Sequence, residues 1–137
     1  MKNMNHLFEN EYMKIGTDES LEFISIKSKK MCDRIFELDK NIALINHFVR
    51  DTKIEKIIFN LKNLNQISKE SLLNEKLIPN LGKMGVTDIA IVTGTNKKVQ
   101  SLLSEIGSYI KPVKRAYHIH SETFSDYHKA VDWISKK

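Results

Sequence analysis

The chain has 137 residues, of which 41% are hydrophobic and 28% are charged, as is typical of one globular domain with its own core. No apolar run approaches the roughly 18–20 residues of a membrane-spanning helix, and the first residues lack the apolar segment of a signal peptide. The single cysteine, Cys32, excludes an internal disulfide and fits a reducing compartment, so we expect a cytoplasmic protein.

The formal net charge of +5 is carried by residues 51–137, which hold fourteen basic and nine acidic residues, whereas residues 1–50 hold eight of each. The densest basic group is Lys111, Lys114 and Arg115, with Lys97 and Lys98 nearby in the sequence. A group of this kind attracts phosphates or an acidic partner, and a solvated basic edge has the same composition. No zinc-finger spacing or basic-aromatic recognition helix accompanies it, so we expect no nucleic-acid partner.

The N-terminal part of the chain predicts a hairpin after a short tail. We expect residues 1–10 to be loosely ordered and residues 11–137 to form a single domain. Apolar residues in Glu11–Ile15 and Leu21–Ile26 flank the polar segment Gly16–Ser20. This pattern is typical of two antiparallel strands joined by a five-residue loop.

The segment Lys29–Arg50 shows the clearest helical periodicity. Its apolar residues recur at steps of four and three, which places them on one stripe of a helix that packs on a sheet. Cys32 lies on this stripe, and burial makes a thiol inert, so we do not expect it to be catalytic. The stripe consists of Met31, Ile35, Leu38, Ile42, Ile45 and Val49.

A strand follows this helix, with the apolar run Ile57, Ile58, Phe59 and Leu61. A short continuous run predicts a strand that helices bury on both faces.

The next segment predicts a helix over Lys69–Met84. Ser68 is a suitable N-cap, because its hydroxyl can accept a hydrogen bond from an amide of the first turn. Pro79 is expected to kink the helix, and Gly85 fits the position just after its end.

The remaining elements alternate in the same way. The sequence predicts a strand over Asp88–Val92, a helix over Lys97–Tyr109 that Pro112 stops, a strand over Ala116–His120, and a final helix capped by Ser125. The order ββαβαβαβα predicts an α/β fold with a mostly parallel or mixed sheet and helices packed on it.

Three segments, KIIFNLKNLNQIS, LIPNLGKMGVTDIAIV and FSDYHKAVDWI, resemble the SpoIIAA-like family of STAS domains, which includes bacterial anti-sigma factor antagonists. The resemblance covers about residues 53–137. It implies a SpoIIAA-like fold and a regulatory role.

In the antagonists, an Asp-Ser-Ser-Gly-like motif follows the central strand, and its second serine is phosphorylated. The four matching positions here are Ser68, Lys69, Glu70 and Ser71, so Glu70 stands in the phosphoserine place. The chain therefore lacks the phosphorylatable motif. Glu70 either imitates a permanent phosphate at a helix N-terminus or is an ordinary first-turn glutamate.

Ligands of open α/β sheets bind outside the carboxyl ends of the strands. At that edge we expect hydrogen-bonding groups without a strong base or nucleophile, which suits binding rather than catalysis. Turns and helix caps favour the same residue types, so a purely structural role stays open. The candidate ligand- or partner-binding residues are Asn63, Asn65, Ser68, Glu70, Thr93, Thr95, Asn96 and Ser121.

Two histidines, His118 and His120, are expected on one face of a strand, where they could hold a metal ion together with Glu122 or His128. No HExxH or CxxC motif accompanies them, and no P-loop, GxSxG or GxGxxG is present. We therefore predict no metal site, no cofactor and no catalytic residue.

The sequence thus predicts a non-enzymatic cytoplasmic regulatory module that binds another protein. The alternative is a protein that binds a lipid or a nucleotide in a cleft between the sheet and the helices Lys29–Arg50 and Lys69–Met84. The sequence does not determine the partner, the ligand or the oligomeric state.

Overall fold

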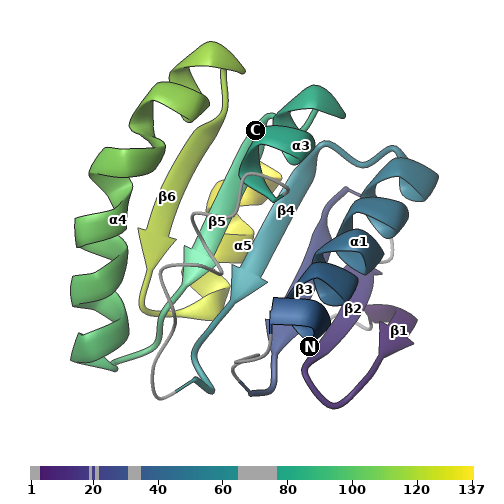
Figure 1. Ribbon diagram of the computed structural model, residues 1–137, viewed down its shortest axis with the longest axis horizontal. Helices are drawn as coiled ribbons and strands as arrows, with labels where there is room; N and C mark the ends of the chain where they lie inside the picture. The colour runs from purple at the N-terminus through teal and green to yellow at the C-terminus, as the bar shows by residue number, and fades with distance from the viewer. Residues whose placement is uncertain (1–3, 19, 21, 31–34, 65–76) are drawn as a thin grey trace.

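The computed structural model describes residues 4–18, 20, 22–30, 35–64 and 77–137. Six strands form one mixed sheet in the order β1-β2-β3-β4-β5-β6, which is also their order in the chain (Figure 1). The strands β1, β2 and β3 pair antiparallel, and β3 to β6 pair parallel. Their bounds are β1 Met4–Glu9, β2 Met13–Asp18, β3 Ile24–Ser28, β4 Lys56–Asn60, β5 Asp88–Val92 and β6 His120–Phe124.

The helices divide unequally between the two faces of the sheet (Figure 1). Helices α1 (Ile35–Thr52), α3 (Ile78–Lys83) and α4 (Lys97–Ala116) lie on one face, and α5 (Tyr127–Ser135) lies on the other. Parallel steps that run in one direction across a sheet, each with a right-handed crossover, put their helices on the same face. Because α5 follows the last strand, it makes no crossover and can pack on the opposite face.

Strand β4 contributes to two separate cores. Ile57 and Phe59 belong to the larger core, under α1 and α3, whereas Ile58 points the other way and packs with Ala130 and Ile134 of α5. Ile57 and Ile58 are both fully buried. The prediction of a strand buried on both faces is confirmed, and so is the α/β fold with a mixed sheet.

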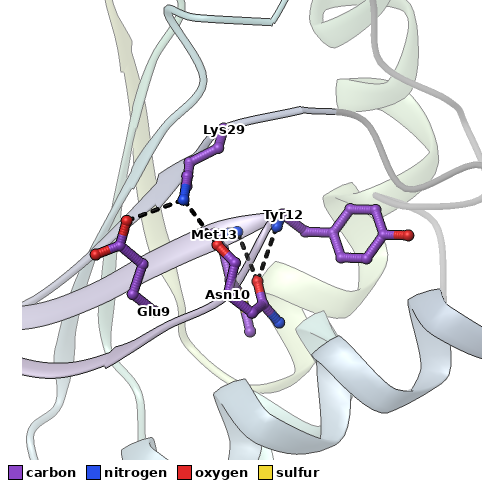
Figure 2. A network of polar contacts seen from close by, with 5 residues as sticks. All are labelled: Glu9, Asn10, Tyr12, Met13 and Lys29. Carbon is purple, nitrogen blue, oxygen red and sulfur yellow. Dashed lines mark hydrogen bonds and ion pairs between the residues drawn. The ribbon is translucent and has the colours of Figure 1, made fainter.

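The N-terminus differs from the expectation of a loosely ordered tail, because Met4–Glu9 pairs with β2 as an edge strand. The turn to β2 is held by Asn10, whose side-chain oxygen accepts the amide N–H groups of Tyr12 and Met13 at 2.9 Å each (Figure 2). The ring of Phe8 lies 5.8 Å from that of Phe48 in α1. The contact between Phe8 and Phe48 joins elements that are distant in the sequence, which the local sequence pattern does not reveal.

The predicted hairpin is confirmed as β2 and β3, with a connection of the expected five residues that lies three positions later than predicted. Gly16, Thr17 and Asp18 belong to β2 and not to the loop. A Cβ atom at Gly16 would lie 2.8 Å from the carbonyl oxygen of Asn5, so this position needs glycine for the close approach of β1.

Two prolines act differently from the prediction. Helix α4 continues through Pro112 to Ala116, with Val113 and Tyr117 packed on the core, and β6 begins only at His120. Packing of the last turn thus outweighs the one backbone hydrogen bond that proline removes. Pro79 lies in the first turn of α3, where its missing N–H is not needed.

The helices end at residues that suit helix caps, one of which the sequence analysis predicted and one of which it missed. Gly85 has φ +94° directly after α3, as its predicted role requires. Asp126, and not Ser125, caps α5, because its carboxylate accepts the amide N–H of His128 at 3.0 Å. Among the described residues, no helix has the length and apolar character that crossing a membrane requires.

We predict that Ile58→Asp prevents stable folding. The carboxylate would be buried against α5 without a partner, at a cost of several kcal/mol, roughly the whole stability of a small domain. Thr123→Asp, on the exposed part of β6, is the control and should fold. Circular dichroism melting checks both. A soluble Ile58→Asp variant that melts cooperatively within a few degrees of wild type contradicts the double-sided burial of β4.

Candidate functional site

The candidate site lies at the carboxyl ends of β4 and β5, where two turns run side by side. The amide N–H of Leu61 donates to the carbonyl oxygen of Val92 at 2.7 Å and joins the starts of the turns. Gly94 has φ +67°, and a Cβ atom there would lie 3.0 Å from the Cβ of Lys62. The turns therefore form one packed edge, which we call the carboxyl edge.

Thr93 holds this edge together from within. It is 1% exposed, and its hydroxyl donates to the carbonyl oxygen of Gly94 at 3.0 Å. Gln100 of α4 donates its side-chain N–H to the same carbonyl at 2.9 Å and lies 3.4 Å from the Thr93 hydroxyl oxygen. The sequence analysis placed Thr93 at the correct edge but missed Gln100, which lies one turn inside the predicted helix.

Asn96 caps α4. Its side-chain oxygen accepts the amide N–H groups of Lys98 at 2.9 Å and Val99 at 3.1 Å. The structural role that the sequence left open therefore holds for Thr93 and Asn96. Their hydrogen bonds fix the backbone of the turn.

The other candidate residues do not all lie at the carboxyl edge. Asn63 and Thr95 are exposed at the carboxyl edge. Ser121 lies at the opposite end of the sheet, because β6 begins at His120 and Ser121 pairs with Ile89. There its hydroxyl accepts a hydrogen bond from the Lys114 ammonium at 2.7 Å. Asn65, Ser68 and Glu70 lie outside the described residues, as does Cys32.

The sequence analysis named Lys97 and Lys98 only as neighbours in sequence of the basic group that ends at Arg115, and it did not place them at this edge. Lys62, Lys97 and Lys98 are all exposed around Asn63 and Thr95. The first turn of α4 contains no acid, although a helix N-terminus carries a partial positive charge that acids usually offset. The edge is therefore strongly cationic, and the adjacent pair Lys97 and Lys98 was the available signal in the sequence.

The predicted histidine pair does not form on one strand. His118 lies in the turn after α4 with φ +57°, and its amide N–H donates to the carbonyl oxygen of Arg115 at 3.3 Å. His120 begins β6. No group of three or more metal-ligating side chains occurs in the part of the chain that the structure describes.

One hollow of about 420 Å³ lies on the outer side of α5 and opens to solvent. It is not between the sheet and α1, where the ligand-binding alternative places a cleft. This hollow therefore does not support that alternative. The hollow is lined by Lys129, Asp132, Trp133, Lys136 and Lys137.

No protein-family model and no curated protein matches the chain. A similar solved structure is described as "Structure of the Anti-Sigma Factor Antagonist SpoIIAA in its Unphosphorylated Form". The alignment covers 98% of both chains with a TM-score of 0.58 and 12% sequence identity. The chain has a SpoIIAA-like fold. At this identity the likeness establishes the SpoIIAA-like, STAS-like architecture that the sequence resemblance implied.

We predict opposite effects for two glycine-to-alanine substitutions. Gly94→Ala should destabilise the protein by about 1–2 kcal/mol, because it strains a left-handed residue and presses on Lys62. Gly107→Ala, inside α4 with nothing within 4 Å of the new Cβ, should stabilise by about 1 kcal/mol. Urea unfolding measures both. Equal shifts of the two variants would contradict the packed turn at the carboxyl edge.

Proposed function

We propose that the protein is a non-enzymatic, cytoplasmic regulatory module that binds another protein through the carboxyl edge. The observation that carries this proposal is the likeness over 98% of both chains to a protein described as an anti-sigma factor antagonist. That description names an action on another protein. If this protein also acts by binding another protein, it needs an exposed, well-ordered surface for that contact.

The carboxyl edge has the properties of such a surface. Its backbone is fixed from below by the hydrogen bonds of Thr93, Asn96 and Gln100, so little conformational entropy is lost on binding. Asn63 and Thr95 offer exposed hydrogen-bonding groups above this support. These groups can position a partner but do not provide a nucleophile or a strong base.

The charge of the edge indicates the kind of partner. Lys62, Lys97 and Lys98 favour an acidic surface, because complementary charge speeds association and orients the encounter. Exposed ion pairs contribute only about 0–1 kcal/mol each, so hydrogen bonds and packing must supply the rest. The proposed partner is thus a protein with an acidic contact surface.

We predict that Lys98→Glu weakens partner binding about tenfold, since it exchanges an attraction for a repulsion. The variant should fold well, because an acid in the first turn of α4 is favoured by the helix dipole. Lys111→Glu is the matched control: it makes the same charge change at an exposed position nearer the other end of α4.

The measurement is capture of proteins from the native lysate on immobilised wild type and on both variants, followed by titration of the captured protein. Wild type and Lys111→Glu should retain the same partner, and Lys98→Glu should lose it. If nothing specific is captured above background, the proposal of a protein-binding module fails. If all three proteins bind equally, the carboxyl edge is the wrong surface.

A further inference from the structure

Strand β1 forms one end of the sheet, and among the described strands only β2 pairs with it (Figure 1). An edge strand presents backbone N–H and C=O groups on its outer side that no neighbouring strand pairs. The side chains of Met4, Asn5, His6 and Glu9 are all exposed, so the strand is open to solvent. We call the outer side of β1 the β1 edge.

The two edge strands of the sheet differ in charge. Edge strands commonly avoid pairing with other chains because they carry charged residues or proline. Strand β6 has Glu122 at its centre. Strand β1 has the sequence MNHLFE, in which Glu9, at the end, is the one residue with a formal charge when histidine is neutral. The middle of β1 therefore carries no formal charge that repels another strand.

The charge of Glu9 is balanced within its own chain. Its carboxylate accepts a hydrogen bond from the ammonium of Lys29 at 2.9 Å (Figure 2). This contact lowers the pKa of Glu9 below its ordinary value. The β1 edge therefore does not need a cation from a partner.

A bulge in β1 directs two consecutive apolar side chains toward α1. The pairing with β2 passes from His6 opposite Gly16 to Phe8 opposite Ile15, which leaves Leu7 as an extra residue. Neighbours on a regular strand point to opposite faces, whereas Leu7 and Phe8 both pack in part against the core under α1. Each is half-buried, so part of each side chain remains accessible.

Helix α1 extends this apolar row. The side-chain oxygen of Asn41 accepts an N–H of Asn10 at 2.8 Å, and the ring of Phe48 lies 5.8 Å from that of Phe8. Leu44 lies three residues after Asn41 and four before Phe48, so it belongs to the same side of the helix, which faces β1. We call the four half-buried side chains along this border the apolar rim: Leu7, Phe8, Leu44 and Phe48.

The charge distribution of the β1 edge fits a second copy of the chain. A strand without formal charge at its centre, bordered by an apolar rim, does not select an acidic or a basic partner. If two copies pair antiparallel, their Glu9 residues lie about 17 Å apart, which is about two Debye lengths at physiological ionic strength. Antiparallel pairing also has two-fold symmetry, so one surface serves both chains.

We propose that the β1 edge pairs antiparallel with the β1 edge of a second copy and forms a dimer with one continuous sheet. The two-fold axis is perpendicular to the sheet, so both α1 helices lie on the same face and the two apolar rims meet above the paired strands. Six residues give an edge about 20 Å long, which makes a smaller contact than the roughly 800 Å² that each partner of a standard interface buries. We therefore expect a reversible dimer with a Kd of roughly 1–100 µM.

The β1 edge is separate from the carboxyl edge, where the proposed protein partner binds. Strands β2 and β3 lie between β1 and β4, which amounts to about 14 Å. Lys98→Glu should therefore dimerise as wild type does, and a variant that cannot dimerise should still capture the partner. The two proposals can thus succeed or fail independently.

The test is sedimentation velocity of the full chain between about 1 µM and about 1 mM, over which wild type should pass from monomer to dimer. His6→Lys places one lysine from each copy close to the two-fold axis and should weaken dimerisation about tenfold or more. Thr123→Lys adds the same charge at an exposed position of β6, the other edge strand, and should dimerise as wild type. Asn5→Lys, also exposed on β1, replaces His6→Lys if that variant does not fold.

Dilution of the isotopically labelled chain locates the contact. The backbone amide signals of Leu7 and Phe8 should change between the two ends of the concentration range, and that of Thr123 should not.

Four outcomes overturn the proposal. One is a wild-type chain that stays monomeric up to about 1 mM. Another is an equal loss of dimer in His6→Lys and Thr123→Lys, which shows an effect of total charge. Growth beyond the dimer shows an open-ended contact between different surfaces, such as β1 with β6 of the next copy. Signal changes confined to α4 or to the carboxyl edge place the contact elsewhere.

Discussion

The burial of β4 on both faces is the constraint on which the rest of the structure depends. Ile57 and Ile58 are fully buried and point in opposite directions. Exposing either side chain would cost about 1.5–3 kcal/mol, so the fold needs a helical layer on each side of this strand. Helices α1 and α3 supply one layer and α5 supplies the other. The turn after β4 then lies at the carboxyl edge of the sheet, which is where the candidate site forms.

Chain connectivity explains why the two layers are unequal. Right-handed crossovers between the parallel strands put their helices on a single face, and only the element after β6 can serve the other. One nine-residue helix cannot cover six strands. None of the described helices therefore packs beside β1 and β2 on the face that carries α5, where Lys14 pairs directly with Lys27 at some cost in mutual repulsion. The unequal helical cover is a consequence of topology, and the lysine pair is a property of this sequence.

Elements with a strong local pattern were predictable from the sequence. The right element types follow from the continuous apolar run at β4 and the helical stripe of α1. In both segments the spacing of the apolar residues matches the burial that the element produces. The pattern of β1 is weak, since an edge strand buries only Leu7 and Phe8 in part and is held by contacts to residues distant in sequence. Pro112 was misleading because packing of the last turn of α4 outweighs local helix preference. That error moved β6 and placed Ser121 at the wrong end of the sheet.

The position of the candidate site was predictable from the sequence, but the roles of its residues were not. Thr93 and Asn96 lie at the expected edge, yet they hydrogen-bond to the backbone of the turn and helix that carry the exposed groups. The register also brings a further cation to the carboxyl edge: Lys27 pairs with Asn60, and Asn60 leads directly into the turn that contains Lys62. Because Lys27 and Lys62 both lie near the carboxyl ends of their strands, their positive potentials add there. An acidic partner approaching the carboxyl edge is therefore steered by these charges together, which raises its association rate more than its affinity.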